Sequence, residues 1–198
     1  MIKAVIFDLN GIFIQGPRLS DRFRDVFGIE TKDFLPILKE IMTKIRKPNA
    51  GSTFSYWKPY LEKWNINLTE KQFFDFWFNA EKEIPELVEL AKQIKKMGVK
   101  VFILSNNFAE RADYYKKNSP FLTKIPDKIY YSWQTGFVKP DPQAFKNLLI
   151  ENNFKPEECI YFDDLEENIK VANALEIKAF LYKNVICLEK TLKDNRVI

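Results

Sequence analysis

The sequence predicts an α/β fold: a doubly wound parallel sheet flanked by helices, interrupted after its first strand by a block of helices. The apolar run Ala4–Phe7 ends on Asp8, and so short a run is typical of a parallel strand buried on both faces. Between residues 16 and 83 the apolar spacing is helical only. From Ile84 onward, helix and strand patterns alternate with short links, which indicates a parallel sheet covered by helices.

Four helices are expected in the block that follows the first strand. Apolar side chains at helical spacing predict them over Leu19–Phe27, Asp33–Lys44, Phe54–Trp64 and a stretch that begins after Thr69. Thr69 and Gln72 fit a capping box at the start of the fourth helix. Helices of this kind pack as a small bundle. We therefore expect residues 16–83 to form a helical domain, and residues 1–15 and 84–198 to form the α/β core.

The second half supplies the remaining strands and helices of the core. Helices are predicted over Pro85–Gly98, Ala109–Asn118, Asp141–Asn152 and Glu166–Leu175. Strands are predicted over Val99–Leu104, Lys128–Ser132, Glu158–Phe162 and Lys178–Leu181. Pro85 suits the first turn of its helix and Gly98 suits the end of the same helix.

The composition indicates a soluble globular protein. The 198 residues are 46% hydrophobic and 29% charged, enough for one core or for a core with a small second domain. No apolar run reaches the roughly 20 residues of a membrane helix, so we expect no membrane partner. The net charge of +4 arises from interspersed acids and bases, which argues against nucleic-acid binding. Since the chain enters its first strand directly, we expect no signal peptide and a cytoplasmic location.

Histidine is absent, and the chain has two cysteines. The lack of imidazole excludes mechanisms that use it as a base or a metal ligand, so chemistry must depend on carboxylates, Lys, Ser, Asn and the backbone. Cys159 and Cys187 both occur in apolar, strand-like runs. We expect both to be small buried hydrophobes rather than disulfide partners.

Polar residues follow the predicted strands or lie in adjoining loops. They are Asp8, Ser105, Asn106, Lys139, Asp163 and Asp164. Each alone has an ordinary explanation, such as a helix N-cap for Ser105 or a solvated side chain for Lys139. In a doubly wound sheet, however, the carboxyl ends of the strands converge where ligands bind. The joint placement of these residues favours one site.

These residue types suit phosphoryl transfer. A carboxylate can attack phosphorus and carry the group as an aspartyl phosphate. Catalysis then depends mainly on positioning and on neutralising oxygen charge, which Lys, Ser and backbone N–H groups can supply. Mg²⁺ prefers one or two carboxylates together with the substrate phosphate, and Asp8 and Asp164 can provide them.

Four segments, in order, resemble the motifs of the haloacid dehalogenase-like (HAD) superfamily. They are Asp8-Leu9-Asn10-Gly11, Leu104-Ser105-Asn106, Lys139-Pro140-Asp141-Pro142 and Tyr161–Asn168. The resemblance covers essentially the whole chain and implies a Rossmann-like core with a small helical cap. It also implies that Asp8 is the nucleophile and a metal ligand, and that Asn10 offers its backbone carbonyl to magnesium.

The resemblance implies roles for the other three motifs as well. Ser105 and Asn106 would hold phosphate, and Lys139 would stabilise charge. Asp164 would bind the metal, with Asp163 binding directly or through water.

The helical cap would set the substrate. In it, Arg46 and Tyr56 lie beside a loop-like stretch and are predicted to face the ligand, and Asn107 follows the second motif closely enough to touch substrate. The cap's many aromatic residues indicate a small organic phosphate, so the expected partner is a small phosphorylated metabolite.

Asn10 departs from the pattern of the family's phosphatases, which have an aspartate there. That aspartate protonates the leaving oxygen and later deprotonates water, and an amide does neither. General acid–base catalysis contributes roughly 10²–10⁴-fold. The superfamily's dehalogenases also lack the aspartate, but they resemble phosphatases less at the fourth motif and use no magnesium. The pair Asp163-Asp164 therefore argues against dehalogenation.

Several functions stay open on the sequence alone. The first is a slow magnesium-dependent phosphatase that favours acyl or aryl phosphates. The second is an inactive relative that binds a phosphorylated ligand or a partner. The third is an active phosphatase in which Asn10 was introduced to trap a complex. A scaffold that retains only the fold is the fourth.

Overall fold

The computed structural model describes all 198 residues and is built around a five-stranded sheet. The strands are β1 (Ala4–Phe7), β4 (Lys100–Ser105), β5 (Lys128–Tyr131), β6 (Cys159–Asp163) and β7 (Lys178–Leu181). Their order is β5-β4-β1-β6-β7, and all neighbours are parallel. The predicted doubly wound parallel sheet is thus confirmed. Because β1 is central, its end at Asp8 lies in the middle of the sheet edge.

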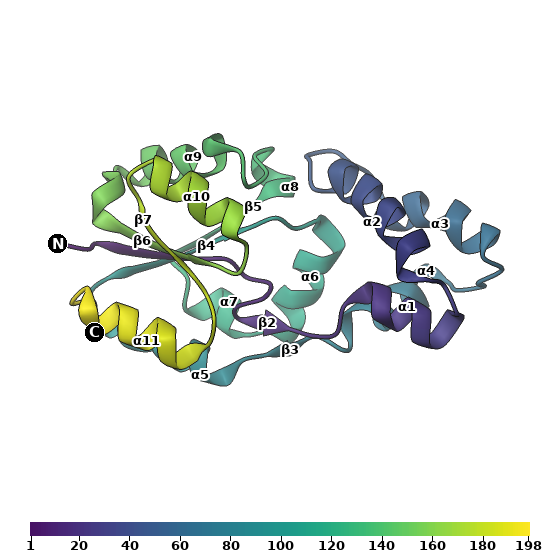
Figure 1. Ribbon diagram of the computed structural model, residues 1–198, viewed down its shortest axis with the longest axis horizontal. Coiled ribbons are helices and arrows are strands. Elements are labelled where there is room, and N and C mark those ends of the chain that lie inside the picture. Colours follow the sequence, from purple (N-terminus) through teal and green to yellow (C-terminus); the bar gives the residue numbers. More distant parts are fainter.

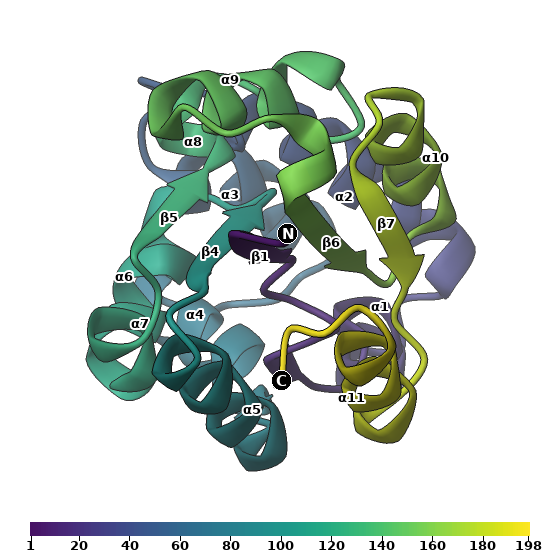
Figure 2. The same cartoon turned by 90° about the vertical axis from the view of Figure 1, so that its left-hand side faces the viewer.

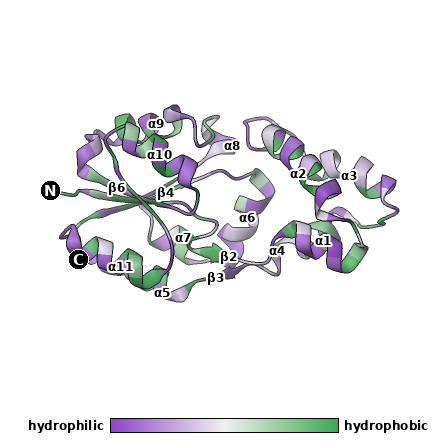
Figure 3. Ribbon diagram, in the orientation of Figure 1, coloured by the Kyte–Doolittle hydropathy of each residue, from purple (hydrophilic) through white to green (hydrophobic).

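Helices cover both faces of this sheet (Figures 1 and 2). One face holds α5 (Pro85–Lys96), α7 (Phe121–Lys124) and α11 (Val185–Asp194), and the other holds α9 (Pro142–Asn152) and α10 (Glu166–Ala174). Short elements α8 (Ser132–Thr135) and η1 (Pro156–Glu158) complete the links. Hydrophilic and hydrophobic residues alternate along these helices, as amphipathic helices require (Figure 3).

The two-residue period of β1 explains why both faces are covered. Val5 and Phe7 pack with the core of α5 and α11, whereas Ala4 and Ile6 pack with the core of α9 and α10. All four side chains are buried. Burial on both sides makes β1 a continuous apolar run, which is the pattern from which the sheet was predicted.

Four further helices stand at one end of the molecule, beyond the carboxyl edge of the sheet (Figure 1). They are α1 (Leu19–Phe27), α2 (Thr31–Ile45), α3 (Thr53–Lys63) and α4 (Glu70–Phe78), and we call residues 19–78 the helical segment. Its core is aromatic: Phe23, Trp57 and Phe73 are fully buried and surround one another. Aromatic side chains of this size bury much apolar area, which lets a segment this small keep its own core.

Two short strands join the helical segment to the sheet. Strand β2 (Ile14–Gln15) pairs antiparallel with β3 (Lys82–Glu83), so the chain enters and leaves the segment side by side. The expectation of helices only between residues 16 and 83 is wrong at β3. A two-residue strand is too short to carry a periodic signal.

Helix α6 (Ala109–Asn118) connects the sheet to the helical segment from the other side. Just before it, Phe108 packs into the segment's aromatic core. The Glu110 carboxylate then accepts hydrogen bonds from the backbone N–H and the hydroxyl of Thr53, both at 2.7 Å. Since Thr53 begins α3, this helix start is fixed to the core of the protein.

Most predicted elements agree with the structure to within two residues, and the capping box is confirmed. Gln72 N donates to Thr69 Oγ1 at 3.3 Å and Thr69 N to Gln72 Oε1 at 2.9 Å. The expectation for Cys187 is wrong. It is exposed in α11, whose first turn is capped by Asn184, while Cys159 is buried in β6 as expected. None of the helices combines the length and the apolarity that crossing a membrane requires.

Candidate active site

Three acidic side chains meet at the carboxyl edge of the sheet. Asp8 follows β1, Asp163 ends β6 and Asp164 comes next. One carboxylate oxygen from each lies within 4.8 Å of the others. Ligand sites of open α/β sheets occur at this edge, so the fold itself brings the acids together.

Asp8 is buried, and only one of its oxygens is engaged by the protein. Oδ1 accepts the Leu9 N–H at 2.7 Å and lies 3.1 Å from Lys139 Nζ. Oδ2 accepts no hydrogen bond. Burial raises the pKa of Asp8 to about 6, with Lys139 opposing the rise and Asp163 adding to it. The carboxyl group is therefore mostly ionised at neutral pH, and its second oxygen is free to attack a ligand.

Lys139 is buried between two acids, and its backbone is fixed by hydrogen bonds to a side chain. Its ammonium group donates to Asp163 Oδ2 at 2.7 Å and to the Tyr161 hydroxyl at 3.0 Å. The Asn106 side chain donates to Lys139 O at 2.7 Å and accepts from Lys139 N at 2.8 Å. Asn106, predicted to hold phosphate, thus fixes the loop that carries Lys139.

Asp163 is saturated with hydrogen bonds from the protein. Oδ2 accepts from Lys139, from the Tyr161 hydroxyl and, at 2.9 Å, from Asn168 Nδ2. Oδ1 accepts the Leu165 N–H at 2.8 Å. Burial alone would raise the pKa of Asp163, but Lys139 and these donors hold it below its usual value. Asp163 therefore positions Lys139, and the less engaged carboxylates of Asp8 and Asp164 face the open side.

Gly11 lets the Asp164 carboxylate approach the first loop. Its φ is +87°, and a Cβ built there would lie 2.2 Å from Asp164 Oδ2. A side chain at this position would push the Asp164 carboxylate away. In the sequence Gly11 appears only as the last residue of the first motif, because Asp164 is far along the chain.

We expect Gly11→Ala to destabilise the protein by about 1–2 kcal/mol, because strain at positive φ adds to the smaller cost of moving the exposed Asp164 side chain away from the new Cβ. Gly28→Ala is the matched control: φ there is +70° but nothing lies within 4 Å of the added Cβ. It is expected to cost only about 1 kcal/mol. Urea denaturation measures both values, and equal losses would show that the clash is absent.

The Asn10 side chain is held by a buried network from another part of the fold. Its Nδ2 donates to the Tyr115 hydroxyl at 2.7 Å, and that hydroxyl donates to Glu81 Oε2 at 2.6 Å. Arg111 forms an ion pair with Glu81. Burial raises the pKa of Tyr115, so its hydroxyl stays protonated and directional. Tyr115 and Glu81 carried no sequence signal.

Two polar groups at the end of β4 and just after it are buried without a partner. They are the Ser105 hydroxyl and Asn107 Nδ2. The backbone of Asn107 is fixed instead by Ser132, whose hydroxyl accepts from Asn107 N at 3.1 Å. Buried polar atoms without partners are rare in native proteins, so these two are available to a ligand.

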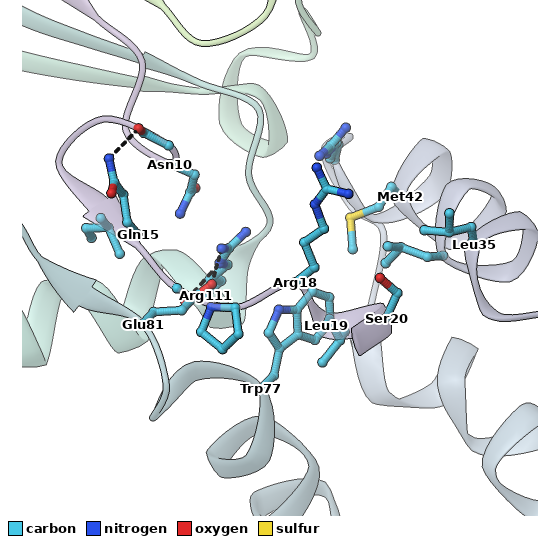
Figure 4. Close-up of a pocket in the computed structure, with 16 residues that line it drawn as sticks. Asn10, Gln15, Arg18, Leu19, Ser20, Leu35, Met42, Trp77, Glu81 and Arg111 are labelled. Carbon is cyan, nitrogen blue, oxygen red and sulfur yellow. Dashed lines mark hydrogen bonds and ion pairs between the residues drawn. The ribbon is translucent and has the colours of Figure 1, made fainter. Parts of the chain in front are cut away.

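A cleft of about 500 Å³ begins at Asn10 and Gly11 and extends between the sheet edge and the helical segment (Figure 4). Arg46, predicted to face a ligand, is among the residues that line it. Tyr56 does not line it, and its hydroxyl donates to the Ala50 carbonyl at 2.8 Å. Of the predicted site residues, the cleft lining therefore joins Arg46 with Asn10, whereas the acids, Lys139 and the residues from Ser105 to Asn107 lie outside the lining.

A family model and solved structures give the same family. The sequence model of the haloacid dehalogenase-like hydrolases matches residues 2–175. A HAD family enzyme of Bacteroides thetaiotaomicron superposes with a TM-score of 0.80 at 24% identity, over 92% of this chain and 94% of that one. Another structure of that enzyme, in complex with magnesium and inorganic phosphate, has a TM-score of 0.79 at 22% identity, over 92% and 95% of the two chains.

Curated relatives differ in length. The D-ribitol-5-phosphate phosphatase of Bacteroides thetaiotaomicron is 24% identical over 206 residues, which is 93% of each protein. The bifunctional epoxide hydrolase 2 of Sus scrofa is 24% identical over 92% of this chain, but the chain spans only 37% of that relative. For the mouse acyl-CoA dehydrogenase family member 10, the span is 17%. The match over residues 2–175, with the fold and the order of its motifs, shows that the chain belongs to the haloacid dehalogenase-like hydrolases.

Proposed function

We propose that this protein is a magnesium-dependent phosphatase of small organic phosphates, with Asp8 as its nucleophile and with turnover slowed by Asn10. The observation that carries the proposal is the cluster of Asp8, Asp164 and Lys139, which lies beside the Asn10–Gly11 loop that lines the cleft. The phosphatase relative and the neighbour that holds magnesium and phosphate support it.

Phosphoryl transfer begins at the free oxygen of Asp8. Asp8 Oδ2 attacks phosphorus, the bond to the ester oxygen breaks, and the products are an aspartyl phosphate and an alkoxide. Lys139 neutralises charge beside Asp8, and the unpartnered Ser105 hydroxyl donates to a phosphate oxygen. Water then attacks phosphorus and loses a proton, which releases inorganic phosphate and restores Asp8. Both proton transfers involve solvent, because the Asn10 amide does not titrate.

The site fits a magnesium ion. Asp8, Asp164 and the backbone carbonyl of Asn10 would hold it, and Asp163 would act on it through water because its own oxygens are saturated. The close approach that Gly11 permits to Asp164 supports this assignment. When bound, the ion neutralises phosphate oxygen charge.

The helical segment would act as the cap over this site. Residues 16–83 would then form one domain, and residues 1–15 and 84–198 the other. The separate aromatic core of the segment and the cleft beneath it support this division. Arg46 would contact the substrate from the cap.

Acid-quench trapping tests the proposed function. With magnesium and ³²P-labelled acetyl phosphate, whose leaving group needs little protonation, we expect labelled Asp8 to accumulate. Accumulation follows because the loss of a base at Asn10 slows the attack of water more than the first step. Asp8→Asn is the control and should show no label. A wild-type protein that never labels contradicts the proposal.

A phosphate-binding protein without turnover is the second candidate, favoured by the neutral side chain of Asn10 next to the nucleophile. It predicts that magnesium with orthovanadate or beryllium fluoride raises the melting temperature, while no labelled Asp8 and no product form. If neither addition raises the melting temperature, both candidate functions fail.

A further inference from the structure

Two arginines in the cleft have no acidic partner. Arg18 precedes α1, Arg46 ends α2, and both line the cleft. Neither lies within 4.0 Å of a carboxylate, although the protein contains sixteen ion-paired contacts elsewhere. The Nε of Arg46 is buried and has no hydrogen-bond partner at all. A buried guanidinium N–H without an acceptor is costly, so its placement indicates an absent acceptor.

The charge of the cleft lining is unbalanced. Its ionisable residues are three arginines and one acid, Glu81, which is engaged by Arg111. Three positive charges less one negative charge leave a surplus of two. Burial lowers the pKa of Arg46 and the nearby Arg111 lowers it further, while Asp8 opposes this. Arg46 thus lies near both another cation and the nucleophile.

The transferring phosphoryl group does not account for these two surplus positive charges. In the proposed function it is served by Lys139, Ser105 and a magnesium ion, all at the sheet edge. Arg18 instead directly precedes the helical segment and Arg46 lies within it, and Figure 4 shows Arg18 extending from the start of α1 toward the residues of α2. The lining also includes apolar side chains, Met42 and Trp77 among them, and in Figure 4 Met42 lies beyond Arg18 as seen from Asn10. The cleft therefore has a basic and partly apolar side at the helical segment, while Asn10 and Gly11 line it at the sheet edge.

Resting on the proposed function, we propose that the substrate is a phosphate monoester with a second anionic group, a carboxylate or a second phosphate, which Arg46 and Arg18 bind. The planar guanidinium fork pairs with either anion through two parallel hydrogen bonds. A short hydrocarbon body between the two anions can pack on the apolar side chains of the cleft lining.

Three substrates with a common two-carbon body test the proposal: ethyl phosphate, phosphoglycolate and ethane-1,2-diol bisphosphate. Phosphoglycolate and the bisphosphate carry a second anionic group. We expect kcat/KM for one or both of them to exceed kcat/KM for ethyl phosphate roughly 10- to 100-fold, the range for hydrogen bonds to a charged group. Comparison of phosphoglycolate with the bisphosphate shows whether the second group is a carboxylate or a phosphate. Equal values for all three overturn the proposal and leave the phosphatase function standing.

Arg46→Met keeps the apolar stem and removes the charge, and Arg18→Met is the second variant. Both should abolish most of the preference for a second anion, measured as the ratio of kcat/KM for each substrate with two anionic groups to kcat/KM for ethyl phosphate. Lys32→Met is the matched control, because Lys32 is exposed on α2, lies outside the cleft and undergoes the same charge change. An equal loss on all three substrates in Arg46→Met overturns the proposal, since it would assign Arg46 to the transferring phosphate.

A protein that does not turn over still gives a result. Calorimetric titration of wild-type protein with each of the three compounds, in the presence of magnesium, measures the same preference as a ratio of Kd values. Tighter binding of a second anion that depends on Arg46, without labelled Asp8, would sink the phosphatase function and retain the anion site. No Arg46-dependent preference in either assay overturns the inference.

Discussion

Asn10→Asp is expected to raise turnover of alkyl phosphates by about 10²–10⁴-fold, the usual contribution of general acid–base catalysis. The new carboxyl group would lie beside the nucleophile's loop, where Asn10 Nδ2 now donates to the Tyr115 hydroxyl at 2.7 Å. The Tyr115 hydroxyl donates its hydrogen bond to Glu81, so its oxygen can accept a hydrogen bond from the new carboxyl group. The protonated carboxyl form is favoured there, and it is the form that a leaving alkoxide needs.

Two comparisons make this prediction specific. The gain in kcat should be large for ethyl phosphate and small for acetyl phosphate, because an acyl phosphate leaving group needs little protonation. Asn10→Ala, which adds no carboxyl group, should give no gain. In the Asn10→Asp background, Tyr115→Phe should lower the pKa of the new carboxyl group. Its protonated form would then persist only at lower pH, which narrows the pH range of activity. Unchanged turnover in Asn10→Asp with intact magnesium binding would contradict the assignment of Asn10 to the proton-transfer position.

Asp8→Asn is expected to stabilise the metal-free protein at pH 8 by about 3 kcal/mol while abolishing phosphoenzyme formation. The pKa of Asp8 rises from 3.8 to about 6, chiefly through burial. The native state therefore favours the protonated carboxyl. The stability that the protonated Asp8 carboxyl contributes is complete below pH 3.8 and is lost as pH rises through 6. An asparagine at this position is neutral at every pH.

The stabilisation should accordingly shrink toward zero near pH 4. Urea denaturation with EDTA at pH 4, 6 and 8 measures it. Asp33→Asn is the control, because it removes the same charge from an exposed position on α2. A pH-independent difference would contradict the linkage, and so would destabilisation at pH 8. Added magnesium should make the wild-type protein more stable than Asp8→Asn, because it stabilises the wild-type protein alone.

The sheet half of the site was predictable because its signals are local. Each strand is a short apolar run, and a polar residue follows it directly, as Asp8 follows β1. The parallel arrangement then places these ends at one edge without further information. The roles of the individual acids were harder to predict. The hydrogen bonds that engage Asp163 come partly from Tyr161 and Asn168, and only the packed structure shows how these two side chains are oriented.

Contacts between distant segments could not be predicted. Asn10 and Tyr115 are 105 residues apart, and no periodicity links them. The same holds for Asn106 and the backbone of Lys139, 33 residues apart. Within the helical segment, Arg46 and Tyr56 were singled out together because both lie beside a loop-like stretch. Only the packing distinguishes them, since the hydroxyl of Tyr56 is bonded to the Ala50 carbonyl.

Helix α6 has a bearing on protein engineering. Within two turns it supplies Glu110 to the start of α3, and both Arg111 and Tyr115 to Glu81. A chimera that exchanges only residues 16–83 for those of a relative would break all three contacts at once. Transplanting a new specificity onto this scaffold should therefore carry residues 108–115 along with the exchanged block, even though they lie far from it in the sequence.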